Sequence, residues 1–279
     1  MSHPIKRVIK MVVSANVFLF DFLVGYFLSL IKISRATGVV LYYHCVQPEE
    51  RNKFAQQMDD LLRWTKPISL DEPKPPNKGI HHSAVTFDDG LICIIENALP
   101  ELIKRKIPST IFVPTGYMGK KPSWVQYDTN RAQQDTVITD KQLKEISNHE
   151  MITIGSHCVT HSNLLWIDNE SSKWEIFQSK NDLESILGFK IKLLSFPYGG
   201  HNATHIELAR EAGYERIFTI IPKCIDPELN DFVVGRVRVD PSDWPIEYRL
   251  KLLGAYRWLP KVFFIKQKIR LLYQTSKFN

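Results

Sequence analysis

The sequence lacks several patterns that mark common kinds of binding site. Its four cysteines are far apart and form no Cys-x-x-Cys pair. The sequence therefore predicts neither a thiolate zinc site nor a disulfide framework, and we expect reduced thiols. Neither Gly-x-Gly-x-x-Gly nor Gly-x-x-x-x-Gly-Lys-Ser/Thr occurs, so the chain offers no glycine-rich site for a dinucleotide or a nucleotide phosphate. Its 279 residues, 44% of them hydrophobic, suffice for one large domain with extensions.

Acidic residues are scarce at both ends of the chain. Residues 1–41 hold five basic residues against Asp21 alone, and eight basic residues follow Glu247 with no acidic one. Because the whole chain carries only +6, the middle is acidic. Basic, apolar ends on an acidic body indicate an anionic partner, either a membrane or nucleic acid. The ends are rich in aliphatic side chains, so we expect an anionic membrane surface and no nucleic acid.

Met11 to Ile31 form a long apolar stretch with a single charge, Asp21. Its length is close to the roughly 20 residues that span a bilayer, but a central aspartate costs about 2.5–3.5 kcal/mol on insertion. We first expect a membrane-inserted or interfacial helix. The alternatives are a helix packed on the protein's own core and a cleaved signal, although no Ala-x-Ala-like cleavage site follows. The tail from Tyr256 to Tyr273 mixes aromatic and basic residues, as an interfacial helix or a solvated basic face would.

From residue 37 onward, strand-like runs alternate with helix-like runs. Repeated β-α units imply parallel strands with crossover helices, either an open doubly wound sheet or a barrel. In both architectures the chemistry collects at the carboxyl ends of the strands. The polar residues that directly follow predicted strands are His44, Asp88, Asp89, His157 and the segment 197–199.

Two histidines and an aspartate of this rim form a candidate metal site. His157 and His161 are spaced i and i+4, so a helical turn would point both imidazoles to one side. Two histidines with one carboxylate are a recurring ligand set for a catalytic divalent metal. Such a cation also supplies the positive charge that the adjacent Asp88 and Asp89 need. Taken singly, each motif is weak, because paired surface histidines and Asp-Asp-Gly turns are common.

The ordered set of motifs resembles the polysaccharide deacetylases, the NodB-homology domain of carbohydrate esterase family four. The matching segments are Thr86 to Gly90, Ser156 to His161, Phe196 to Gly199 and Asp240 to Trp244. The resemblance implies a distorted parallel (β/α) barrel. It also implies a metal-dependent hydrolase that removes N-acetyl groups from an N-acetylated sugar in a saccharide or lipid-linked glycan.

The resemblance assigns a role to each matching residue. It implies that Asp89, His157 and His161 hold a divalent metal, usually zinc, and that Asp88 is the general base. The backbone N–H of Tyr198, between Pro197 and Gly199, stabilises the oxyanion. The substrate site comprises Pro197, Gly199, Asp243 and Trp244, and Trp244 walls the acetyl pocket.

Two residues that the family pattern expects are missing. Family members often carry an arginine two residues before the proline, where this chain has Ser195, and we expect Arg236 or Arg238 to reach the base instead. The histidine of a late Leu-x-His motif is also absent, because no histidine follows His205. We expect His44 to act as the general acid, with His201 and His205 as rivals.

These gaps leave alternatives open. One is a degenerate, non-catalytic carbohydrate-binding member, and another is an amidase of the same fold that acts on a non-sugar carbon–nitrogen bond. We divide the chain into a membrane-associating segment (residues 1–36), a deacetylase domain (37–248) and a basic amphipathic tail (249–279). We expect it at the cytoplasmic face of a membrane, with a signal-anchor and an extracytoplasmic domain as the alternative.

Overall fold

The computed structural model describes residues 4–30, 37–71, 80–124, 135–225 and 230–262. Most of the predicted tail, residues 263–279 of 249–279, lies outside these ranges. The helices are α1 (Pro4–Leu30), α2 (Arg51–Trp64), α3 (Leu99–Lys104), α4 (Asp140–Ser147), α5 (Asn169–Leu187), α6 (Ala203–Glu211) and α7 (Pro245–Leu252). The strands are β1 (Thr37–Tyr43), β2 (Lys66–Pro67), β3 (His81–Phe87), β4 (Ser109–Val113), β5 (Ile152–Ser156), β6 (Leu193–Ser195), β7 (Arg216–Thr219), β8 (Val233–Gly235) and β9 (Val237–Arg238).

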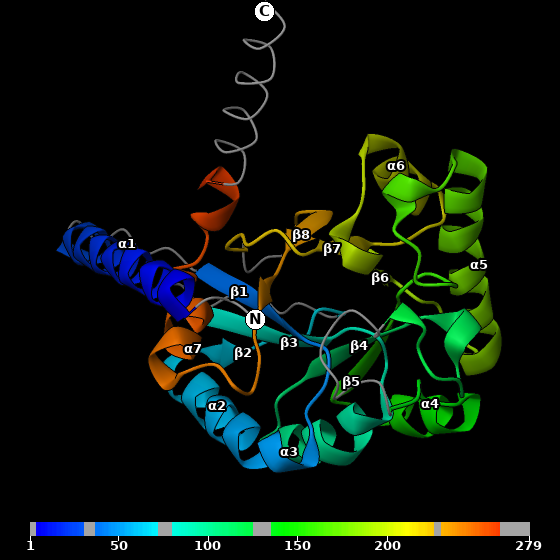
Figure 1. The fold of residues 1–279 in the computed structure, drawn as a ribbon, viewed down its shortest axis with the longest axis horizontal. Coiled ribbons are helices and arrows are strands. Elements are labelled where there is room, and N and C mark those ends of the chain that lie inside the picture. Colours follow the sequence, from blue (N-terminus) through cyan, green and yellow to red (C-terminus); the bar gives the residue numbers. More distant parts are fainter. Residues whose placement is uncertain (1–3, 31–36, 72–79, 125–134, 226–229, 263–279) are drawn as a thin grey trace, which may run out of the picture.

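The strands form one parallel sheet that is nearly closed into a barrel (Figure 1). Its order is β8-β7-β6-β5-β4-β3-β1-β9, and β2 pairs with β3 beside this path. The two outermost strands, β8 and β9, are consecutive in the sequence and are joined by Arg236 alone. The chain itself therefore crosses the seam of the barrel. The predicted barrel is confirmed, although the run 233–239 forms two short strands where the pattern suggested one.

Side chains that alternate along the strands fill two separate apolar regions. Val40, Ala84, Phe112, Leu193 and Phe218 belong to the smaller buried cluster, enclosed by the sheet. The neighbouring positions on the same strands belong to the larger cluster between the sheet and its helices. Strands buried on both faces are typical of parallel sheets covered by crossover helices.

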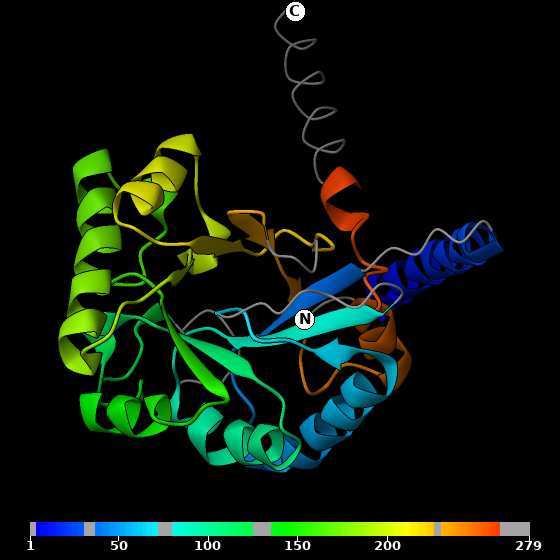
Figure 2. The same cartoon turned by 180° about the vertical axis from the view of Figure 1, so that it is seen from behind.

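Helices α2 to α6 cover the outside of the sheet in sequence order (Figures 1 and 2). Helix α4 starts at the N-cap Thr139, which forms a capping box with Gln142. Gly188 ends α5 in the left-handed conformation with φ 78°. Helix α7 runs through the predicted boundary at residue 248, and α1 lies against α7 on the outside of the barrel.

Gly155 of β5 gives a direct test of packing inside the barrel. A Cβ atom there would lie 2.5 Å from two ring carbons of the fully buried Phe112. We expect Gly155→Ala to lower the free energy of unfolding by about 1–3 kcal/mol, as overpacking of a core does. Denaturant unfolding measures it. Gly25→Ala is the control, because nothing lies within 4 Å of its added carbon. Equal midpoints for both variants would contradict this packing.

Candidate active site

Three buried side chains bring metal-binding atoms to one point at the carboxyl ends of the strands. Asp89 Oδ1 lies 3.1 Å from His161 Nε2 and 3.6 Å from His157 Nε2. Ligand atoms bound tetrahedrally at about 2.1 Å lie about 3.4 Å apart, so these spacings fit a zinc-sized ion. Asp89 Oδ1 is buried and has no hydrogen-bond partner among the described residues. The donor set and its unsatisfied oxygen therefore fit a divalent metal.

The ionisation of these groups also suits a metal. Burial lowers the pKa of His157 to about 4, although the nearby aspartates raise it. The imidazole is therefore neutral at pH 7, which is the form that binds metals. Burial raises the pKa of Asp89, but the opposing effect of His161, with smaller effects of His44 and His157, brings it well below the ordinary value.

The loop that carries the two histidines is not the helical turn that the i, i+4 spacing suggested. Cys158 and His161 both have left-handed backbones, with φ of 62° and 58°. Glu175 of α5 holds the loop by accepting hydrogen bonds from the N–H groups of Val159 and Thr160. The histidines still converge, because the irregular loop folds back over the end of β5, and their ring centroids are 4.9 Å apart.

Left-handed backbone is concentrated at the site. Asp89 (φ 70°) and Tyr198 (φ 57°) join the two loop residues, and Lys106 is the remaining non-glycine residue with positive φ in the described ranges. Such conformations cost of order 1–3 kcal/mol each and persist where the surroundings impose them. Four of the five non-glycine residues with positive φ in the described ranges therefore belong to the candidate site and its loops.

A hydrogen bond fixes the orientation of His157. Its Nδ1 lies 2.7 Å from the backbone oxygen of Ser195, which can only accept a hydrogen bond. Nδ1 is therefore protonated, and the free Nε2 points at Asp89.

Asp88 is not one of these three side chains and pairs with an arginine. Arg236 Nη1 and Nη2 donate to its two carboxylate oxygens at 2.7 and 2.8 Å. Burial raises the pKa of Asp88, but the adjacent guanidinium of Arg236 holds it below the ordinary value. Ser195 Oγ accepts from Arg236 at 2.7 Å and donates to Asp88 at 3.3 Å. The arginine missing at position 195 is thus replaced by one from the barrel seam.

His44 follows β1 and reaches the same rim. It lies near enough to Asp88 and Asp89 to contribute to the lowered pKa of both carboxyl groups. Its ring centroid is 5.6 Å from that of Tyr42. Of its rivals, His201 stacks on Phe196 and contacts the backbone oxygen of Gly199. His205 is buried in the capping box of α6.

Aromatic rings flank the ligand His161 on two sides. The Tyr198 ring meets it edge-on at 4.8 Å, while Pro197 and Gly199 form the surrounding turn. Trp124 stacks on it at 4.0 Å with an interplanar angle of 13°. Sequence reasoning missed Trp124, because a single tryptophan in a long loop has no periodic neighbour that would show which way it points.

Among the described residues, no contact joins Asp243 or Trp244 to Asp89, His157 or His161. Asp243 accepts a hydrogen bond from Lys251 of α7 at 2.7 Å. Trp244 lies under the guanidinium of Arg7, 4.5 Å from its ring centroid. Both residues therefore contact α1 and α7, and their assignment to the acetyl pocket stays a prediction.

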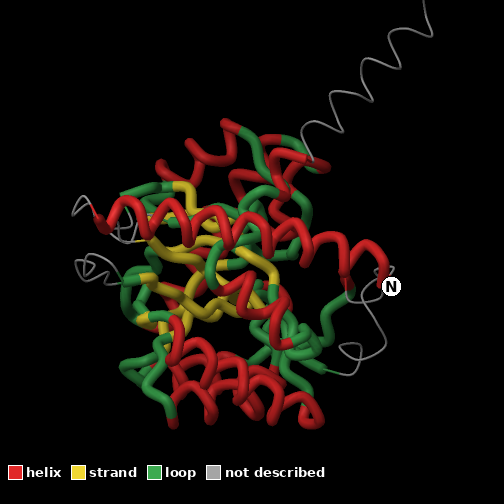
Figure 3. The backbone as a smooth tube through the Cα atoms, turned by 90° about the vertical axis from the view of Figure 1, so that its left-hand side faces the viewer, coloured by secondary structure: helices red, strands yellow, loops and turns green. Residues whose placement is uncertain are grey.

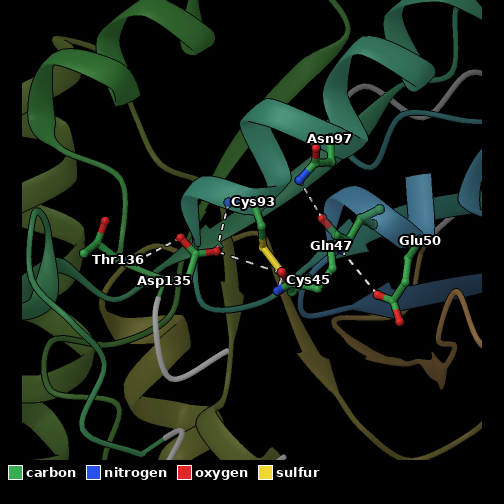
Figure 4. The surroundings of a disulfide bond; sticks show 8 residues. Cys45, Gln47, Glu50, Cys93, Asn97, Asp135 and Thr136 are labelled. Carbon is green, nitrogen blue, oxygen red and sulfur yellow. Dashed lines mark hydrogen bonds between the residues drawn. A yellow bond between two sulfur atoms is a disulfide. The ribbon is translucent and has the colours of Figure 1, made fainter. Parts of the chain in front are cut away.

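Cys45 and Cys93 form a disulfide beside this rim (Figure 4). The expectation of reduced thiols is therefore wrong for this pair. The two cysteines are 48 residues apart, but each follows one of the adjacent parallel strands β1 and β3, and their Cα atoms are 5.8 Å apart. Asp135 lies alongside and accepts the N–H of Cys93 at 3.0 Å. Spacing along the sequence could not reveal this proximity.

The barrel with an aspartate and two histidines at its rim defines the class of NodB-type deacetylases. A family profile described as "Polysaccharide deacetylase" matches residues 76–217. The match covers half of the chain, and the protein therefore belongs to the polysaccharide deacetylase family.

Individual proteins similar to this chain support the family match. The poly-beta-1,6-N-acetyl-D-glucosamine N-deacetylase of Staphylococcus aureus (strain MRSA252) is 30% identical over 175 residues, which are 60% of this chain and 57% of that protein. The chain thus spans little more than half the length of this relative. The structure of IcaB from Ammonifex degensii has a TM-score of 0.66 and 26% identity, covering 78% of this chain and all of that one. The fold is also that of the Streptococcus pyogenes deacetylase PplD, with a TM-score of 0.61, 22% identity, and coverage of 77% of this chain and 98% of that one.

The pairing of Arg236 with Asp88 yields a prediction about stability. We expect Arg236→Met to lower the free energy of unfolding by about 3–5 kcal/mol, because it leaves a buried carboxylate unpaired. Adding Asp88→Asn should recover much of that loss, since both charges are then gone. Chemical denaturation measures the single and the double variant against the parent protein. Arg238→Met is the control, because Arg238 is exposed. A double variant no more stable than Arg236→Met would contradict the pairing.

Proposed function

We propose that this chain is a metal-dependent N-deacetylase that acts on a glycan containing N-acetylglucosamine. The observation that carries the proposal is the pair of adjacent aspartates with separate partners. Asp88 is held ionised by Arg236, while Asp89 joins His157 and His161. The name of the Staphylococcus aureus relative supports a polymer of N-acetylglucosamine as the substrate.

Each residue has a defined task in this proposal. Asp89, His157 and His161 would hold a divalent metal, with zinc favoured by the histidine-rich set. Bound there, the metal lowers the pKa of a water molecule and polarises the acetamido carbonyl. Asp88 accepts the proton of the attacking water at its carboxylate, and Arg236 keeps that carboxylate oriented. The N–H of Tyr198 donates to the developing oxyanion, and His44 gives a proton to the leaving amine.

Acetate release tests the proposal. Full-length protein is stripped with a chelator, reloaded with zinc, and incubated with β-1,6-linked N-acetylglucosamine oligomers. We expect acetate from the reloaded protein and little from the stripped protein. Oligomer binding without acetate release would favour the non-catalytic carbohydrate-binding alternative, and release only from a non-sugar amide would favour the amidase.

The two adjacent aspartates should behave differently when each is changed. Asp88→Asn should keep the bound metal but lower turnover by about 10²–10⁴-fold, the usual contribution of a general base. Asp89→Asn should lose both metal and activity, because it removes a ligand atom. Elemental analysis of the purified variants beside acetate release checks this. Equal metal content in both would show that the division of roles is wrong.

His44 should supply the proton for the leaving amine. A general acid must carry its proton, so activity should fall on the basic side of the pH–rate profile. His44→Ala should lower turnover and alter this basic limb of the pH–rate profile, and His201→Ala should leave the limb in place. Full turnover and an unchanged limb in a folded His44→Ala variant would rule out this role.

Within the described residues, one helix, spanning Pro4–Phe27, is long and apolar enough to cross a membrane. We propose that the protein associates with a membrane through this segment, and two observations bear on the face. The basic ends favour the cytoplasmic face by the positive-inside rule, while the disulfide favours an oxidising compartment. Alkylation of thiols in intact cells decides: blocked Cys45 and Cys93 place the domain in the cytosol, and a trapped disulfide places it outside.

A further inference from the structure

A stripe of polar side chains runs along one side of the otherwise apolar helix α1. Arg7, Ser14 and Asp21 are spaced by seven residues, close to two helical turns, so they lie on one face. They are less exposed than their neighbours, and Ser14 is fully buried. The polar stripe therefore faces the protein.

Every member of the polar stripe has a partner near the other end of the chain. Arg7 donates to Glu247 at 2.5 Å and to the backbone oxygen of Ser242 at 3.1 Å. Ser14 Oγ accepts the indole N–H of Trp258 at 2.9 Å.

Asp21, the charge that the sequence left unexplained, makes two hydrogen bonds with the guanidinium of Arg257. Helix α1 is thus attached sideways to α7 and to the turns that follow it.

The outward side of α1 is almost wholly apolar. Figure 3 shows the helix lying across the outside of the molecule. Its exposed large hydrophobic residues are Ile5, Val8, Ile9, Val12, Phe18, Leu19, Phe20, Phe22, Leu23, Val24, Tyr26, Phe27 and Leu30. Lys6 and Lys10 are exposed beside them.

A groove with basic side chains runs beside the helix. It has a volume of about 610 Å³ and is lined by the apolar Val13, Val17 and Phe20 and by the basic Lys223, Arg257 and Lys261. An apolar floor beside basic groups is complementary to the acyl chains and anionic headgroups of phospholipids.

We propose that α1 lies in the plane of an anionic phospholipid bilayer with its apolar side immersed, and does not cross the bilayer. The inference deepens the membrane association proposed above. A spanning orientation would separate Arg7 and Asp21 from their partners or draw Glu247 and Arg257 into hydrocarbon, where charges are costly. The in-plane orientation keeps all three stripe contacts and places Lys6, Lys10 and Lys261 at headgroup level.

The orientation also positions the catalytic rim. Arg7 contacts the turn 240–244, which directly follows β9 at the carboxyl end of the sheet. Attachment through α1 therefore holds this edge of the rim close to the bilayer surface. A glycan at or linked to the membrane could reach it without leaving the surface.

Nitroxide depth measurements test the orientation. Single cysteines replace Val8, Val12, Leu19 and Leu23 in a Cys224→Ser background, and the labelled full chain is bound to vesicles of phosphatidylcholine with phosphatidylglycerol. We expect all four labels at similar shallow depths, about 5–10 Å below the headgroups. A shallow label at position 8 with a label near the bilayer centre at position 19 would establish a spanning helix and overturn the proposal. Labels that remain in water would overturn the membrane association itself.

A charge test separates headgroup attraction from simple apolar adsorption. Replacing Lys6 and Lys10 by Gln should weaken binding to the anionic vesicles by about 5-fold per lysine. Binding to pure phosphatidylcholine vesicles should not change. The matched control, Lys141→Gln with Lys144→Gln on α4, should leave both unchanged. Equal losses in the two pairs, or no loss in either, would overturn the anionic bilayer as the partner of this face.

Discussion

The ion pair between Arg236 and Asp88 holds together the barrel and the site. Arg236 is the one residue between the two edge strands, and its side chain is fully buried. A guanidinium has five N–H donors, and here they go to Asp88 twice, to Ser195, to Thr86 and to the backbone oxygen of Thr219. A buried charge is tolerated only when its hydrogen bonds are satisfied in this way. The acceptors lie on or directly after three strands, β3, β6 and β7, so the pair links the seam of the barrel to the middle of its sheet.

The same pair explains why two carboxylates can stand side by side at the end of β3. Neighbouring carboxylates repel each other and raise each other's pKa unless each has its own positive partner. Asp88 has Arg236 on one side, and Asp89 lies with His157 and His161 on the other, where a bound divalent metal would supply the positive charge. One residue can therefore serve as a base while its neighbour binds a metal.

Residues that directly follow strands could be predicted from the sequence, because parallel strands bring their carboxyl ends to one rim. That rule placed Asp88, Asp89, His157 and His44 correctly. It could not give the Cys45–Cys93 disulfide or the stacking of Trp124 on His161, since both depend on how loops fold after the strands end. The i, i+4 spacing of His157 and His161 also suggested the wrong local structure, because both lie on an irregular loop and not on a helical turn.

The N-terminal segment shows a further limit of hydropathy, which treats each charge as though it had no partner. By that measure Asp21 is a defect in a membrane-spanning helix, but in the structure it pairs with Arg257, 236 residues further along the chain. Because of this contact, Asp21 attaches α1 to the rest of the protein. With Arg7 and Ser14 it makes α1 amphipathic, although the segment is too apolar to look so in the sequence. The orientation of an apolar helix is thus set by where its few polar side chains find partners, and in this chain they find them on the catalytic domain.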